Sequence, residues 1–163
     1  GAHRDLPSFP PRRSSDLVVL AVAERLVDAA TAAGDNVNHT NRGLTFSEYP
    51  GLKVYALDDD HEAAEDDVTW PHEQLHELSI AVDCVVQDPA DLEGAMDALV
   101  EEVLIALEGT AAASQLSPLQ GVRLRSVGST RSVRTDGERA TGTASVRLRA
   151  TYSTSADDPA TFL

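Results

Sequence analysis

Two histidines and a glutamate near the middle of the chain have the spacing of a zinc-hydrolase motif. Residues 72–76 read H-E-x-x-H, with His72, Glu73 and His76 in the signature positions. On a helix the two histidines would lie one turn apart and could bind zinc, while Glu73 would activate the attacking water. The context favours a strand, because Pro71 directly precedes the motif and an alternating apolar pattern begins two residues after it. No histidine follows His76 as a third ligand, so we predict no metal site, with a small zinc-dependent hydrolase as the alternative.

Other signatures of catalysis or cofactor binding are missing from the sequence. There is no G-x-S-x-G, no G-x-x-x-x-G-K-[ST] and no G-x-G-x-x-G. The single cysteine, Cys84, lies on the apolar side of a predicted strand, which is typical of a buried and unreactive thiol. We therefore predict no enzyme, no catalytic residue and no cofactor.

Charge is distributed unevenly along the chain. The net charge of −14 argues against sequence-specific binding of nucleic acid, because such binding relies on neutralising phosphates. No lysine or arginine occurs between Val54 and Val122, a stretch that holds seventeen acidic residues, whereas Gly121 to Tyr152 holds seven arginines against two acidic residues. The longest apolar run, 17–23, is shorter than the roughly 20 residues needed to span a bilayer, so no membrane partner is expected.

The arginines alternate with apolar residues in two predicted strands, 122–125 and 144–152. Each strand places valine or leucine on one face and arginine on the other. Two interpretations stay open: these arginines pair with acidic strands of the same fold, or they meet the acidic surface of a neighbouring subunit, head to tail. The candidate interface residues are Arg123, Arg125, Arg147 and Arg149.

Hydrophobic periodicity predicts one strand and one long helix in succession. From Leu78 to Val86 the apolar residues alternate, which indicates a half-buried strand. Asp88 and Pro89 suit the start of a helix that runs to Glu108 and ends at Gly109. One stripe of this helix is apolar, and we expect it to form the main core contact of the domain; its members are Leu92, Met96, Leu99, Val103 and Leu107.

The remaining elements complete a predicted α+β domain. A first helix, capped by Ser15 or Asp16, should run to about residue 33, and strands at 43–46 and 52–57 should flank a turn at 49–51. Asp136-Gly137 is a turn signal between the last two strands. The predicted fold has two layers, a mainly antiparallel sheet of four to five strands with two helices packed on one face.

Two segments differ in composition from the rest. Residues 1–16 are rich in proline, arginine and serine and are interpreted as a non-native or flexible segment, which leaves residues 17–159 as a single domain. Residues 58–67 form an acidic run, expected to be a solvated loop because its charges repel one another. The run lacks the glycine that a calcium loop requires.

The order of elements, taken with strand 78–87, helix 88–108 and the closing residues 145–154, resembles the tail terminator proteins of long-tailed phages. This is the family of the lambda-type minor tail protein U, and the resemblance covers 17–159. It implies a non-enzymatic subunit of a hexameric ring that caps the tail tube, ends its polymerisation and joins it to the head connector. The implied partners are further copies of the chain, the tail tube protein and the head–tail connector protein. The implied location is the virion tail, after assembly in the host cytoplasm. A head–tail connector or neck subunit is the structural alternative, and a monomeric binding module is a third possibility.

Overall fold

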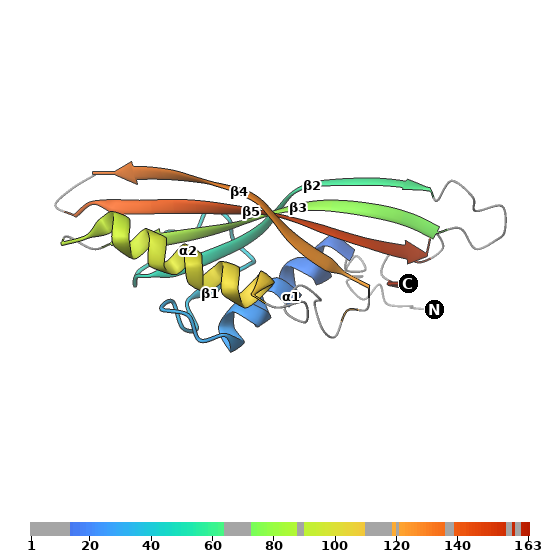
Figure 1. The fold of residues 1–163 in the computed structure, drawn as a ribbon, viewed down its shortest axis with the longest axis horizontal. Coiled ribbons are helices and arrows are strands. Elements are labelled where there is room, and N and C mark those ends of the chain that lie inside the picture. The colour runs from blue at the N-terminus through green and yellow to red at the C-terminus, as the bar shows by residue number, and fades with distance from the viewer. Residues whose placement is uncertain are drawn as a thin grey trace, which may run out of the picture.

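The two helices of the described chain pack on the same face of one long, twisted sheet (Figure 1). The computed structural model describes residues 14–63, 73–87, 90–109, 119, 121–135, 139–155, 158 and 161–163. Its strand order is β1-β2-β3-β5-β4, with every neighbouring pair antiparallel except β1 and β2. The predicted α+β class, with two helices against one sheet face, is confirmed. The elements are α1 (Ser14–Asp28), β1 (Val37–Asn38), β2 (Gly51–Ala63), β3 (Glu73–Val86), α2 (Leu92–Glu108), β4 (Arg123–Arg134) and β5 (Thr141–Ser155).

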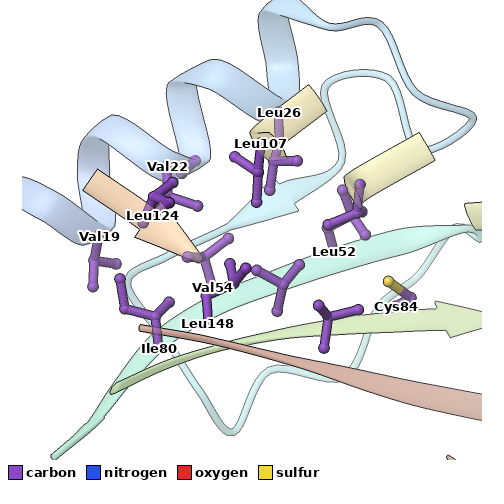
Figure 2. Close-up of a cluster of buried hydrophobic side chains, with 14 of the residues drawn as sticks. Val19, Val22, Leu26, Leu52, Val54, Ile80, Cys84, Leu107, Leu124 and Leu148 are labelled. Carbon is purple, nitrogen blue, oxygen red and sulfur yellow. The ribbon is translucent and has the colours of Figure 1, made fainter. Parts of the chain in front are cut away.

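The core lies between this sheet and the helices. On β3 the side chains of Leu78, Ile80 and Val82 are fully buried, as the alternating pattern predicted. Figure 2 shows the side chains of Val22 and Leu26 from α1 directed toward the same buried cluster. Because successive strand residues point to opposite faces, the other side chains of β3 face away from the helices. We call these two sides the helix face and the open face.

Helix α1 is shorter than predicted. It ends at Asp28, and Ala30 then takes a left-handed conformation with φ of 52°. The backbone N–H of Ala32 donates to the Glu102 carboxylate of α2 at 2.6 Å, a tertiary contact that replaces a further helical turn. Residues 1–13 lie outside the described part of the chain, whereas Ser14 to Asp16 belong to α1 and the Ser14 side chain is buried.

Helix α2 starts at Leu92 with Asp91 as its N-cap. The Asp91 carboxylate accepts from the backbone N–H of Gly94 at 3.0 Å, so the predicted start at Pro89 is too early. The predicted cap Asp88 lies, with Pro89, outside the described residues. The predicted apolar stripe is buried from Met96 to Leu107, and its first member, Leu92, is partly buried at the edge of the core.

The predicted strand at 43–46 is wrong. The edge strand is β1, which pairs in parallel with β2 at Leu52 and Lys53. The segment that follows β1 covers one end of the open face, where Phe46 is buried against Gly51 and the Arg42 guanidinium lies 4.2 Å from the centre of the Tyr55 ring. Burying a phenylalanine on the sheet removes more apolar area from water than a short exposed strand would.

The predicted acidic loop is also wrong over residues 58–63, which belong to β2. Asp59 and Asp60 are in register with Leu78 and Glu77 of β3, after an irregular step that follows Ala56. This end of β2 and β3 extends beyond the helices in Figure 1. Residues 64–67, and the predicted turn at 136–137, lie outside the described residues.

Candidate functional site

The open face of β4 and β5 carries a concentration of arginines. These two strands contain six arginines and no acidic residue. All four predicted interface arginines are exposed on the open face, where Arg125 is in register with Arg149. Arg123 is in register with Thr151, and Arg147 with Gly128, beside the irregular step in β4. The structure thus brings together the residues that the alternating pattern singled out, and we call them the basic face: Arg123, Arg125, Arg134, Arg147 and Arg149.

One member of the basic face, Arg134, was missed by sequence reasoning. It is in register with Thr141 and shares the orientation of the other four arginines. The apolar alternation that identified them stops at Leu124, because both sides of β4 beyond that residue are largely exposed. The remaining arginine, Arg131, lies on the helix face and pairs with Asp97 of α2.

The basic face is only slightly neutralised within the subunit. The Arg149 Nη1 atom lies 3.7 Å from Glu77 Oε1 on β3, with both side chains about half exposed. Within the described part of the chain, Arg123, Arg125 and Arg147 make no ion pair. Like charges directly opposite across an antiparallel pair, as at Arg125 and Arg149, are destabilising. Intrachain pairing therefore accounts for one of the four predicted arginines.

The acidic counterpart lies elsewhere on the molecule. Helix α2 has five acidic residues and no basic residue. Three of its carboxylates have partners within the subunit. Asp97 pairs with Arg131, Glu102 accepts from the N–H of Ala32, and Glu108 accepts from the N–H of Ser126. At the far end of β2, Asp58 and Asp60 are exposed.

His76, from the H-E-x-x-H motif, is buried within a polar cluster at the extended end of the sheet. Its Nδ1 atom is 3.1 Å from Asp59 Oδ1, and its Nε2 atom is 2.8 Å from Thr154 Oγ1. The ring stacks on Tyr152 with centroids 4.7 Å apart. The Tyr152 hydroxyl lies 3.2 Å from Ser14 Oγ, and burial raises its pKa to about 12. The contacts of this cluster join β2, β3, β5 and the first residue of α1.

This geometry does not match the zinc site that the motif suggested. Residues 73–76 are extended, so Glu73 and His76 point to opposite faces of the sheet. Both ring nitrogens of His76 already have partners, which leaves neither for a metal. His72 lies outside the described residues. Among the residues that the structure describes, no group of three or more histidine, cysteine, aspartate or glutamate side chains is arranged to hold a metal ion.

The order Asp59–His76–Thr154 resembles a nucleophile relay, but its burial opposes that role. Thr154 is completely buried, so its hydroxyl is closed to a substrate. An open recess of about 550 Å³ lies beside the cluster, lined in part by His76, Tyr152 and Leu163.

Within the described chain, no helix has the length and apolarity to cross a membrane.

Comparison with known proteins gives little help. No family model matches the chain, and no curated protein matches it. One similar solved structure is a chain from the "Virion of native gene transfer agent (GTA) particle", with 18% sequence identity and a TM-score of 0.45. That alignment covers 82% of this chain and 94% of the other. Because identity and TM-score are both low, the assignment of function depends on this chain's own residues.

Proposed function

We propose that this chain is a structural subunit of a phage or prophage tail. In this role it forms a ring of identical subunits, a hexamer as in the family it resembles, that caps the tail tube and ends its polymerisation. The ring also joins the tube to the head–tail connector protein, so the chain is located in the virion tail after assembly in the host cytoplasm. The single observation that supports this role best is the basic face, exposed on one side of a subunit whose net charge is strongly negative.

A ring needs an interface between two different surfaces of the same subunit. Such a head-to-tail contact closes when the rotation between neighbours divides a full turn. The basic face offers one half of a complementary pair, and the acidic surfaces on α2 and β2 offer the other. Electrostatic complementarity of this kind fixes orientation and suppresses wrong pairings.

The proposed role requires no catalysis. A cap acts by binding the last ring of the tube and leaving no surface to which another tube subunit can add. Its chemistry is therefore that of an interface, and the exposed charges of Arg147 and Arg149 are suited to binding the acidic groups of a neighbouring subunit or of the tube. His76 and Thr154 are buried and lie within hydrogen-bonding distance of each other, which is consistent with a structural role for His76 of the H-E-x-x-H motif.

Mass measurement of the purified protein tests ring formation. We expect a ring mass by light scattering and rings in negative-stain electron micrographs for the unmodified chain. Reversing two charges, Arg147→Glu with Arg149→Glu, should shift the protein to monomer, because like charges would then meet in the interface. The control is Arg139→Glu, a single reversal of the same kind at an exposed position outside the strands. A wild-type protein that stays monomeric at high concentration contradicts the proposal.

Assembly with a tube protein tests the capping role. Added to a self-polymerising tail tube protein, the ring should shorten the tubes in proportion to its concentration, and the double-reversal variant should not. Rings that leave tube length unchanged but bind the connector protein would assign the chain to the neck instead.

A further inference from the structure

In the described part of the chain, most of β2 and the outer strand β4 have an edge without a strand partner, and these two edges carry opposite charge. Within the described residues, β1 covers β2 only at Leu52 and Lys53, so the rest of β2 has β3 as its single neighbour. β4 likewise has β5 as its single neighbouring strand, although the N–H of Ser126 in its first half already donates to Glu108 of α2. The free part of β2 includes the exposed Asp58 and Asp60, whereas β4 has four arginines and no acidic residue. A free edge presents a row of backbone N–H and C=O groups that can pair with another strand.

The topology allows these two edges to meet in neighbouring copies. β2, β3, β5 and β4 alternate in direction, so β2 and β4 run in opposite directions. A copy rotated about an axis roughly parallel to the strands would place its β2 antiparallel beside β4 of the first copy. Both copies would then keep their helices on the same side, and the sheet would continue from one subunit to the next.

The register of the sheet places the arginines of β4 and the aspartates of β2 at the same level along the strand direction. Arg123 is in register with Thr151, Thr151 with Glu77, and Glu77 with Asp60. One step further, Arg125 is in register with Arg149 and Arg149 with Ser79. Ser79 faces the irregular step of β2 that contains Asp58. In an unstaggered continuation Arg123 and Arg125 of one copy therefore face Asp60 and Asp58 of the next.

We propose that the ring closes by sheet extension, with the first half of β4 pairing antiparallel with the free part of β2 in the next copy. This inference rests on the proposed ring-forming function and names its interface. Backbone hydrogen bonds supply the general attraction, and the arginine–aspartate pairs select the partner. Pairing β4 with β4, or β2 with β2, would bring like charges together, so charge disfavours the closed dimer and favours the head-to-tail ring.

Charge exchange tests this interface. Asp58→Arg with Asp60→Arg should convert the ring to monomer, and so should Arg123→Asp with Arg125→Asp. The chain that combines all four substitutions should recover the wild-type ring mass by light scattering. Far-UV circular dichroism and thermal unfolding of each variant verify that the exposed positions tolerate the changes.

The outcomes separate the interface from the function. If the variant with Asp58 and Asp60 reversed keeps the wild-type ring mass, sheet extension is overturned while the ring itself stands. If the four-substitution chain stays monomeric and folded, sheet extension is also overturned. If the wild-type chain forms no ring, the proposed function fails and this inference fails with it.

Disulfide trapping provides a test that does not depend on charge. Arg123→Cys combined with Asp60→Cys should give disulfide-linked multimers on mild oxidation. Within one subunit these positions are three strand spacings apart, about 14 Å, which is beyond disulfide reach. The control pairs Asp60→Cys with Ser132→Cys, which lies roughly 30 Å further along β4, and it should stay unlinked. Rings that form without cross-linking the first pair would overturn the proposal.

Discussion

At the scale of single residues, a side chain's surroundings decide its chemistry more than the motif it belongs to. His76 matches a metal ligand in spacing, yet both of its ring nitrogens are used by Asp59 and Thr154. Its ring packs flat against Tyr152. A buried polar group with all its partners present stabilises one arrangement of the strands around it. His76 therefore joins β2, β3 and β5.

Cys84 gives a prediction at the same scale. Its thiol is fully buried, and burial, followed by the negative charges of Asp83 and Glu102, raises its pKa to about 12. We expect iodoacetamide to leave the native protein unlabelled at pH 8 and to label it once in about 6 M guanidinium, as measured by mass spectrometry. Rapid labelling of the native protein would contradict this.

The same pKa predicts a pH dependence. The unfolded thiol ionises near pH 9, while the folded thiol stays neutral until about pH 12. The contribution of Cys84 to stability is therefore complete below pH 9 and is lost as the pH rises from 9 toward 12. Tyr152, whose pKa is also raised to about 12, acts in the same direction from pH 10 upward.

At the scale of elements, α2 and the central strands hold the sheet and helices together. The apolar stripe of α2 packs on β5 so closely that a Cβ added to Gly142 would lie 2.6 Å from Met96 Sδ. The Asp97 and Glu108 side chains tie the same helix to β4, one through Arg131 and the other through the N–H of Ser126. β4, one of the two strands that carry the basic face, is thus fixed to the helix layer at two points.

Truncating the stripe tests the importance of α2. Leu99 is 2% exposed, and Leu99→Ala should lower the free energy of unfolding by about 2–5 kcal/mol, since it removes buried apolar area and leaves a cavity. Ile105 lies on the same helix but is 60% exposed, so Ile105→Ala should change stability by less than about 0.5 kcal/mol. Urea unfolding followed by circular dichroism measures both. Equal effects of the two substitutions would contradict a core that lies against the Leu99 side of α2.

At the scale of the whole molecule, the asymmetry of charge is the main feature. The basic face and the acidic end of β2 lie on different parts of one rigid sheet, so a single subunit cannot bring them together. Two neighbouring copies can bring these surfaces into contact. A subunit with this distribution is therefore suited to head-to-tail assembly, and it repels copies that approach with like surfaces.

Ionic strength should control such an assembly. The screening length falls from about 10 Å at 0.1 M salt to about 3 Å at 1 M, so exposed arginine–aspartate pairs weaken. We expect the ring mass to shift toward monomer in 1 M NaCl while the circular dichroism spectrum is unchanged. A ring mass that is insensitive to salt would indicate an interface held by apolar contacts instead.

The sequence by itself determined the elements whose periodicity reports burial. The apolar residues of 78–86 alternate with the period of a strand, and those of the α2 stripe repeat with the period of a helix. The sequence alone therefore predicts the type of each element and the face that it buries. The burial of Cys84 and the shared orientation of the arginines at 123, 125, 147 and 149 follow from the same alternation.

Only the tertiary structure decided which strands are neighbours and what the charged segments do. Residues 58–63 and 128–134 are strands without an apolar alternation, because their conformation is imposed by the pairing of β2 with β3 and of β4 with β5. The parallel β1, the cover formed by Phe46 and the partners of His76 also depend on residues far away in the chain. Local periodicity records whether a side chain is buried, whereas strand order and register are set by contacts between distant segments, which no local window contains.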